Sequence, residues 1–432
     1  MEQPDALHVW NRNPGMKVLH LSTWKKRCGI ADFTESVVDQ LSALGIENTV
    51  FPLDVATLRY TTSGEFVEEM DRFAWMATGF DAVHVQHEFS LFTGSGGVFE
   101  TILHFAHLLE ALRKVNKPVV VTFHSGAALH TLLPSPETDQ RQSIPGASGA
   151  LLGAIKRFRL RRIARQLDGL WRQRIAPFFD GRPGCFRGVV HSARTRRELV
   201  DSGFSPECIS VIPLGYQLRD QSLLNENRAA AKAKLGLPPD AKLLSIFGFV
   251  AAYKGQRTAV QALRLLPPQF HLAIVGGPHP ENTTDQTLDM VLETWEGQDP
   301  ARLTVTGYVT REVIDLYHAA TDICLAPFQS GNPTGSASLT WALTSGKPTI
   351  ASNIPAFAEI QQAADCLLLS TPDAVYELAW HIQRLAADPE LQEKLAQNAL
   401  HFAAQHSWDR VANLLVDVYR EITHVGKARA AA

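Results

Sequence analysis

The sequence is poor in cysteine, and its few cysteines are scattered. The 432 residues include five cysteines, none of which forms a CxxC pair with another. Isolated cysteines in odd number predict neither a disulfide framework nor a zinc site. Cys324 and Cys366 lie in apolar runs, where a free thiol is most simply part of a hydrophobic core.

Long apolar runs and a large net charge are also absent. No run approaches the roughly 18 apolar residues of a membrane-spanning helix, and the opening residues, MEQPDALHVWNRNPG, lack the basic-then-apolar order of a signal peptide. We therefore expect a cytoplasmic protein. A net charge of −3 gives no overall attraction to nucleic acid, so we expect no nucleic-acid partner.

The pattern that is present predicts two α/β halves. With 45% hydrophobic and 20% charged residues over 432 positions, the chain is typical of a soluble protein with two or three domains. Apolar runs predict strands in the first half at 17–22, 49–53, 82–85, 119–123, 189–191 and 209–213, and in the second half at 243–247, 272–275, 303–305, 323–326 and 349–352. Helical patterns lie between them, which indicates parallel sheets. We expect a leader at 1–15, an N-terminal domain at 16–215, a C-terminal domain at 216–400 and a helix at 401–432 that returns to the first domain.

Polar residues follow two expected strands of the first half. His87 and Glu88 come after the strand at 82–85, and His124 comes after the strand at 119–123. Ligands collect at the carboxyl edge of an open α/β sheet. A single histidine there is more often a hydrogen-bonded structural residue, but histidines at two neighbouring strand ends favour a site. The first loop contains no GxGxxG, so a tight dinucleotide site is not indicated.

In the second half, a turn of small residues at 334–337 opens a helix expected at 338–344. Free N–H groups and the positive end of the helix dipole make such a helix start an anion site, most simply for phosphate. An ordinary capped connection between a strand and a helix is the alternative. Lys254, at the mouth of a helix expected at 256–266, could meet a diphosphate as a point charge or could be a common surface lysine.

The segment 151–179 has the pattern of a basic amphipathic helix. Apolar residues recur at steps of three and four, and Asp168 is the one acid on a face of eight cations, namely Lys156, Arg157, Arg159, Arg161, Arg162, Arg165, Arg172 and Arg174. Such a helix can lie on an anionic membrane or dock an anionic acceptor. It can equally be a solvated helix packed on the sheet. If the helix lies on an anionic membrane, the cytoplasmic protein would attach peripherally to the inner face of that membrane.

An ordered set of motifs resembles the retaining enzymes of glycosyltransferase family 4. The matching segments are CGIADFT at 28–34, QHEFSLF at 86–92, VVVTFHS at 119–125, ISVIPLG at 209–215, KG at 254–255, VGG at 275–277, GYVTREVIDLYHAATDICLAP at 307–327, SGKPTIAS at 345–352 and SWDRVANLLVDVY at 407–419. Single motifs are weak, but the ordered set covers nearly the whole chain. The resemblance implies a GT-B fold, in which two Rossmann-like parallel-sheet domains face each other across a cleft.

The resemblance also implies an activity and a set of site residues. A hexosyltransferase of this kind moves a sugar from a nucleotide-diphosphate donor, here most simply linked to UDP or GDP, to a glycan or lipid-linked acceptor, with the anomeric configuration kept and with no metal or cofactor. His124 would contact the transferred sugar, and Lys254 would neutralise the diphosphate leaving group. The implied donor-site residues are Gly29, Gly248, Phe249, Val309, Gly335, Ser336, Ala337, Trp341 and Glu359, and the implied acceptor residues are His87 and Glu88.

The chain departs from the family at three positions. The family usually has two glutamates eight positions apart, the second of which holds the ribose hydroxyls, but Pro333 and Trp341 stand there. Phe249 replaces the usual arginine. Trp341 can stack or fill space, and Glu359 could recover part of the ribose or sugar contact or could pair on the surface. These departures keep two alternatives open, a scaffold or nucleotide-binding protein without catalysis and a sugar-nucleotide epimerase.

Overall fold

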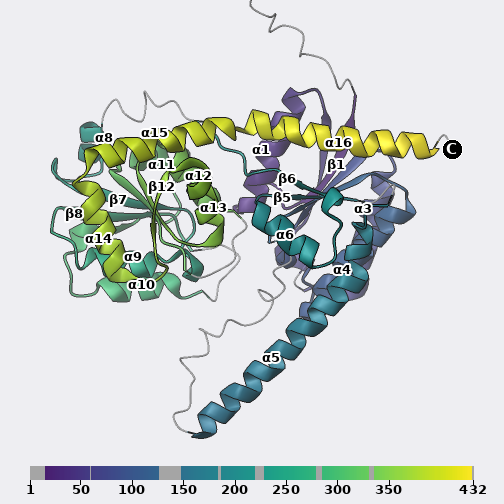
Figure 1. Ribbon diagram of the computed structural model, residues 1–432, viewed down its shortest axis with the longest axis horizontal. Helices are drawn as coiled ribbons and strands as arrows, with labels where there is room; N and C mark the ends of the chain where they lie inside the picture. The colour runs from purple at the N-terminus through teal and green to yellow at the C-terminus, as the bar shows by residue number, and fades with distance from the viewer. Residues whose placement is uncertain are drawn as a thin grey trace, which may run out of the picture. The chain divides into compact units, whose positions relative to one another are not determined.

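The chain folds into two compact α/β units. The computed structural model describes residues 15–58, 60–125, 147–182, 186–218, 228–278, 285–329 and 335–430, with the backbone alone at 147–157 and 424–430. One unit comprises Met1–Pro213 with Val411–Ala432, and the other comprises Leu214–Arg410. The domain breaks expected from the sequence lay after 215 and after 400. Each unit contains one six-stranded sheet (Figure 1).

In the first unit, every strand pair is parallel and the order is β2-β1-β3-β4-β5-β6. The strands are β1 (Lys17–Ser22), β2 (Glu47–Pro52), β3 (Ala82–His87), β4 (Val119–Phe123), β5 (Arg187–Val190) and β6 (Ile209–Val211). The helices are α1 (Gly29–Ala43), α2 (Val55–Leu58), α3 (Ser63–Ala77), α4 (Val98–Lys114), α5 (Ala147–Arg174), α6 (Ala193–Asp201) and, from Val411 on, α16 (Trp408–Ala430). Short 3-10 turns are η1 (Phe89–Phe92), η4 (Ala176–Phe178) and η5 (Pro206–Cys208).

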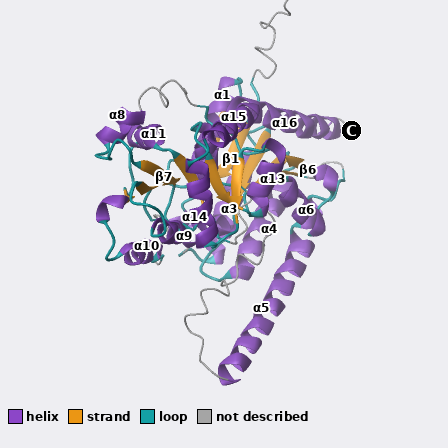
Figure 2. Cartoon of the chain, turned by 60° about the vertical axis from the view of Figure 1, so that its left-hand side comes forward, coloured by secondary structure: helices purple, strands orange, loops and turns teal. Residues whose placement is uncertain are grey.

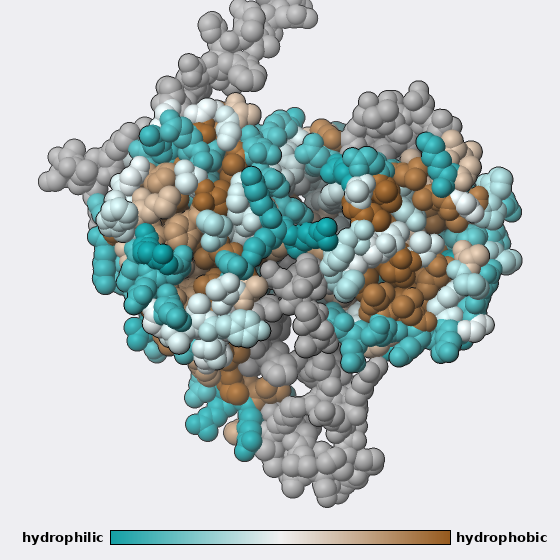
Figure 3. All heavy atoms as spheres, turned by 180° about the vertical axis from the view of Figure 1, so that it is seen from behind, coloured by the Kyte–Doolittle hydropathy of each residue, from teal (hydrophilic) through white to brown (hydrophobic). Residues whose placement is uncertain are grey.

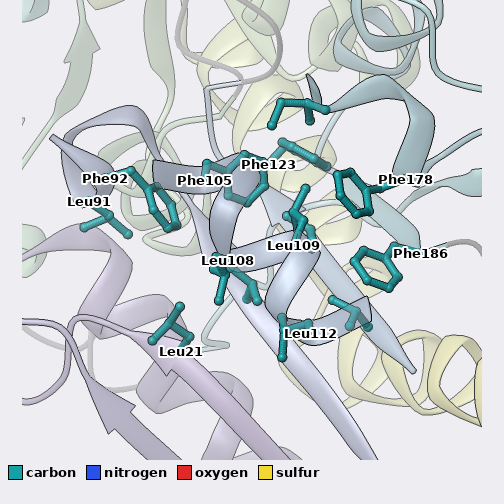
Figure 4. Packing of buried hydrophobic residues seen from close by; sticks show 14 of the residues in the cluster. Leu21, Leu91, Phe92, Phe105, Leu108, Leu109, Leu112, Phe123, Phe178 and Phe186 are labelled. Atoms are coloured by element: carbon teal, nitrogen blue, oxygen red, sulfur yellow. The ribbon is translucent and has the colours of Figure 1, made fainter. Parts of the chain in front are cut away.

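The core of the first unit is unusually aromatic. All residues of β3 and β4 are buried, as expected for central strands of a parallel sheet covered on both faces. Phe92, Phe105 and Phe123 point toward one another from η1, α4 and β4 (Figure 4). Trp171 of α5 is fully buried and packs edge-on to Phe123, with ring centroids 6.3 Å apart. The C-terminal part of α5 is therefore anchored in the core.

In the second unit, the strand order is β12-β11-β10-β7-β8-β9, again with parallel pairs throughout. The strands are β7 (Lys242–Phe247), β8 (Phe270–Val275), β9 (Leu303–Val305), β10 (Ile323–Ala326), β11 (Thr349–Ser352) and β12 (Leu367–Ser370). The helices are α8 (Arg228–Lys234), α9 (Gln256–Leu263), α10 (Thr287–Trp295), α11 (Arg311–Ala320), α12 (Ala337–Thr344), α13 (Pro355–Ala364), α14 (Val375–Ala386) and α15 (Pro389–Gln405). The 3-10 turns are η6 (Ala252–Lys254) and η7 (Pro300–Arg302).

The order of the strands in the second sheet reverses between β7 and β10. Because β8 and β9 continue on one side of β7 while β10 to β12 continue on the other, their connecting helices leave in opposite directions. Helices α9, α10 and α14 pack together, and α11 packs on α8. Figure 2 shows helices on both sides of the strands. The carboxyl ends of β7 and β10 thus form a switch point, where open α/β sheets bind their ligands.

The α/β prediction of two Rossmann-like units is confirmed, and the differences are local, at the bounds of elements and at one edge strand. Strand β12 was not predicted, because four residues between two helices carry too little pattern. Helix α9 ends at Leu263 and not at 266, since the residue before a proline avoids the helical region and Pro267 follows. Helix α5 ends at Arg174 and not at 179, since Pro177 follows and η4 replaces the last turn.

Within the described part of the chain, no helix has both the length and the apolar character needed to cross a membrane. The space-filling view from behind shows hydrophilic residues mixed with apolar patches on both units (Figure 3). Most of the long helix α5 extends away from the sheet of its unit (Figure 1).

Candidate active site

Two glycines build the carboxyl edge of β7. Gly248 directly follows the strand with a φ of +101°, and a Cβ there would lie 2.8 Å from Nζ of Lys254 and 3.4 Å from Cβ of Ser338. A Cβ on Gly276, which follows β8, would lie 2.1 Å from the carbonyl oxygen of Gly248. The close approach of these backbones places the Lys254 ammonium beside the first turn of α12.

The Lys254 side chain is a buried cation. It is 7% exposed, and burial lowers the pKa of its ammonium to about 8. Its Nζ lies 5.8 Å from the ring centroid of Phe249 and 6.0 Å from that of Tyr253. Among the described residues, no carboxylate pairs with this ammonium. Because an unpaired buried charge is costly, the position is suited to an anion that arrives from outside the chain.

Helix α12 begins against this lysine. Ser336 is its N-cap, and its Oγ accepts a hydrogen bond from the backbone N–H of Leu339 at 3.2 Å. The first N–H groups of a helix have no acceptor within the helix, so those of Ala337 and Ser338 are available to a ligand. Gly335 precedes the cap and is half-buried. A cation and a helix start therefore meet at the switch point, which is an arrangement suited to phosphate.

Aromatic rings flank the Gly248 turn on the side of β8 and β9. The ring of Tyr308 lies against Gly277, where a Cβ would be 3.1 Å from the ring, and its hydroxyl donates to the carbonyl oxygen of Pro278. The rings of Tyr308 and Phe249 are edge to face, with centroids 6.3 Å apart. Val309 is half-buried and packs on the apolar cluster that contains Phe247. At this turn, Tyr308 is exposed and Val309 is half-buried.

Trp341 is held in a column of stacked groups. His318 of α11 stacks on Phe247 at 3.8 Å between centroids, and the Trp341 ring lies 6.1 Å from His318 at an interplanar angle of 23°. The guanidinium carbon of Arg311 lies 4.6 Å from the Trp341 ring centroid. The indole thus both stacks and fills space. Pro333, the other departure, lies outside the described residues, and Glu359 is half-buried on α13.

In the first unit, His124 is the end of a buried chain of hydrogen bonds. Its Nε2 donates to Oε1 of Gln86 at 2.9 Å, and Nε2 of Gln86 contacts Nε2 of His84 at 3.3 Å. Nδ1 of His84 in turn contacts the hydroxyl of Tyr419, on α16, at 2.6 Å. Burial holds the pKa values of His84 and His124 well below the usual range. His124 is therefore a neutral imidazole, and its hydrogen bond to Gln86 fixes the orientation of the ring.

The two predicted acceptor residues lie in different environments. His87 is 1% exposed, and its ring packs among the core aromatics, 4.2 Å from Phe105. This position does not support contact with an acceptor. Glu88 is half-buried at the edge, where its carboxylate caps η1 and accepts a hydrogen bond from Oγ of Ser125 at 2.9 Å. Glu88 thus joins the ends of β3 and β4 beside His124.

Gly29 is the first residue of α1 and is exposed. A Cβ at this position would meet no atom within 4 Å. The start of α1 therefore leaves room for a group outside the chain.

Arg311 and Tyr419 were missed by sequence reasoning, because their partners are distant in the chain. In the described residues, no cluster of three or more histidine, cysteine, aspartate or glutamate side chains could hold a metal ion.

The chain is similar to glycosyltransferases in sequence and to solved glycosyltransferase structures in fold. Residues 227–402 match the family described as glycosyl transferases group 1. The match lies within the second unit, and it confirms the resemblance to glycosyltransferases that the motifs indicated.

Two solved structures align with nearly the whole chain. HepE from Anabaena, solved in complex with UDP-glucose, has a TM-score of 0.66 at 17% identity, covering 94% of this chain and 100% of that one. Sucrose-phosphate synthase from Thermosynechococcus elongatus has a TM-score of 0.68 at 18% identity, covering 94% and 99%. At such identities the likeness shows the fold alone, which confirms the GT-B class.

Curated relatives share part of the chain. The D-inositol 3-phosphate glycosyltransferase of Streptomyces bingchenggensis is 26% identical over 243 residues, 54% of this chain and 52% of the relative. That of Xylanimonas cellulosilytica is 28% identical over 204 residues, 47% of this chain and 48% of the relative. The chain thus spans about half the length of the curated relatives it matches. The names of these relatives agree with the predicted class of enzyme.

Proposed function

We propose that the protein is a retaining hexosyltransferase that uses a UDP- or GDP-linked sugar, needs no metal, and acts on a glycan or lipid-linked acceptor. The observation that carries the proposal is the unpaired, buried ammonium of Lys254 beside the start of α12 at the switch point of the second sheet. Cleavage of the bond between the sugar and the diphosphate leaves the electron pair, and so one additional negative charge, on the terminal phosphate. A preorganised cation and free N–H groups stabilise that charge without a metal ion.

Each remaining site residue has a role in this proposal. His124 contacts the transferred sugar as a neutral hydrogen-bonding group, and Gly29 leaves the start of α1 open to the donor phosphate or the acceptor. The exposed ring of Tyr308 borders the base, beside Val309. Trp341 provides an apolar wall near the ribose, and Glu359 binds hydroxyl groups of the ribose or the sugar.

The named relatives support a nucleotide-sugar donor. HepE was solved with UDP-glucose, and the relatives with partial coverage are named as transferases that act on D-inositol 3-phosphate. These names favour UDP over GDP as the first nucleotide to test. The alternative, a nucleotide-binding scaffold without catalysis, is favoured by one observation, namely that Trp341, at a position where the resemblance implies a ribose-binding glutamate, is held in a stacked column.

Calorimetric titration with UDP, GDP and dTDP, first without metal and then with Mg²⁺, tests the proposal. We expect UDP to bind without metal, and Mg²⁺ to leave the affinity within about a factor of two, because Lys254 and α12 supply the positive charge. Release of UDP from UDP-glucose then distinguishes the enzyme from the scaffold. Binding without any transfer or hydrolysis would support the scaffold, and a strict need for Mg²⁺ would contradict the metal-independent site.

We also propose that α5 attaches the protein peripherally to the cytoplasmic face of an anionic membrane. Its described part exposes six arginines, namely Arg159, Arg161, Arg162, Arg165, Arg172 and Arg174, although Arg172 pairs with Asp168 at 2.9 Å. Phe158 is 67% exposed at the end of this part. Arginines around an exposed aromatic ring are suited to the interface of an anionic bilayer.

Flotation with vesicles that contain an anionic lipid tests this attachment. We expect the protein to float at low salt and to stay below at raised salt, because the attraction is screened. Changing Arg161, Arg162 and Arg165 to glutamate should abolish flotation. The matched control changes three exposed cations of the second unit, Lys234, Arg257 and Arg410, to glutamate. Equal loss in both variants would show that only the net charge matters and that α5 is not the attachment site.

A further inference from the structure

His191 lies at the carboxyl edge of the first sheet, beside His124. It directly follows β5, and β5 pairs with β4, which His124 follows. The two imidazole rings have centroids 5.3 Å apart. The ring of Phe33, on α1, lies against both, at 5.0 Å from His124 and 5.3 Å from His191. His191 therefore shares its surroundings with the histidine proposed to contact the sugar.

The hydrogen-bonding state of the His191 ring follows from its neighbours. Nδ1 lies 3.0 Å from the carbonyl oxygen of Ile212, and a carbonyl oxygen can only accept. Nδ1 must therefore be the protonated nitrogen, and it donates a hydrogen bond to this oxygen. Burial lowers the pKa of this imidazole to about 4, so the ring is neutral near pH 7. The neutral ring has one N–H, which leaves Nε2 with a lone pair that can only accept a hydrogen bond.

That lone pair has no partner in the described part of the chain. Nε2 of His191 is buried and makes no hydrogen bond. A buried acceptor left unsatisfied is rare and costs stability, so each one requires an explanation. Nitrogens of other described histidines are also unsatisfied, among them those of His20 within β1, His87 within β3, His104 on α4 and His381 on α14. Of these rings, only that of His191 directly follows a strand.

The chemistry of Nε2 selects its ligand. A lone pair repels phosphate and carboxylate oxygens, and it accepts a hydrogen bond from a group such as a hydroxyl. Its two ring neighbours, His124 and Phe33, are uncharged, because the pKa of His124 is also lowered by burial. A hydroxyl group of a sugar or other polyol is the donor that a glycosyl acceptor provides. We propose that His191 binds the acceptor by accepting a hydrogen bond from one of its hydroxyl groups, an inference that rests on the proposed transferase function.

The nitrogen itself gives a direct test that does not depend on activity. In ¹⁵N-histidine-labelled protein, the Nε2 resonance of His191 is assigned by its loss in His191→Phe, or in His191→Gln if the first variant does not fold. We expect an unprotonated Nε2 that shifts on addition of glycerol, myo-inositol or glucose at millimolar concentration, and does not shift with UDP alone. A protonated Nε2, or no shift with any of the three polyols, would overturn the proposal.

Kinetics separate this role from the transferase proposal. With UDP-glucose as donor and myo-inositol as acceptor, His191→Phe should raise the acceptor KM about tenfold or more, which is the loss expected for one hydrogen bond to a buried acceptor. His191→Gln, which keeps an acceptor oxygen, should recover part of this loss, and the Kd for UDP should stay within about a factor of two in both variants. An unchanged acceptor KM in His191→Phe contradicts the proposal. If wild-type protein neither transfers nor hydrolyses the donor, the transferase function fails, and the nitrogen shifts still decide the role of His191.

Discussion

Replacing Lys254 with alanine is expected to lower sugar transfer by about two to three orders of magnitude, the effect of removing one group that stabilises a developing anion. The ammonium is 7% exposed beside Gly248 and the start of α12, so bulk water cannot readily replace it. The kcat of transfer or of UDP-glucose hydrolysis is the quantity to measure. Lys234→Ala, which removes an exposed lysine of the same unit, is the matched control and should keep wild-type turnover.

The pH dependence of UDP binding provides a second measurement of the same lysine. Because burial lowers the pKa of Lys254 to about 8, the ammonium is charged at pH 7 and loses its proton as the pH rises through that value. Bound diphosphate favours the charged form and raises the pKa again, so binding takes up a proton above pH 8. Affinity should therefore be constant near pH 7 and fall above about pH 8 in wild type. A Lys254→Ala variant with full turnover, or with the same fall in affinity, would contradict the assigned role.

Replacing Gly255 with alanine is expected to destabilise the second unit by about 2–5 kcal/mol, from strained backbone and from overpacking together. Gly255 has a φ of +68°, and a Cβ there would lie 1.8 Å from the carbonyl oxygen of Pro327, which directly follows β10. Two backbones therefore touch at this turn, and neither can move without shifting the end of a strand. Because Lys254 is the preceding residue, UDP affinity should fall as well.

Gly236→Ala is the control for this substitution. Gly236 belongs to the same unit and has a φ of +70°, but a Cβ there would meet no atom within 4 Å. It should cost only the backbone strain of about 1–2 kcal/mol and leave UDP binding unchanged. Denaturant unfolding of both variants gives the comparison. Equal losses of stability would show that the contact between Gly255 and Pro327 relaxes freely.

Much of the fold could be predicted from the sequence, because central parallel strands are continuous apolar runs. The strands Lys17–Ser22 and Val119–Phe123 were predicted to the residue. The edge strand β12 was missed because four residues between helices carry too little pattern. His87 shows why the position of a single residue is harder to predict. The strand was expected to end before this histidine, but β3 includes it, and the sequence does not distinguish the two cases.

The candidate site was only partly predictable, for a related reason. The association of Gly248 with Lys254 follows from the order of turns in an α/β unit, so local pattern was enough. The column of Phe247, His318 and Trp341 joins a strand to two helices from separate parts of the chain. The spacing of apolar residues along the chain does not predict contacts between such separate elements. The bond between Tyr419 and His84 is the extreme case, because 335 positions separate its partners.

That bond has a practical consequence for dividing the protein. The first unit is not one continuous stretch of chain, because residues from Val411 on belong to it. A protein cut after Pro213 would lack Tyr419, which is fully buried, and would leave His84 without that contact and the edge of β4 without its support. Separate production of this unit therefore requires the last helix to be supplied again, either as a synthetic peptide or joined to Pro213 through a linker.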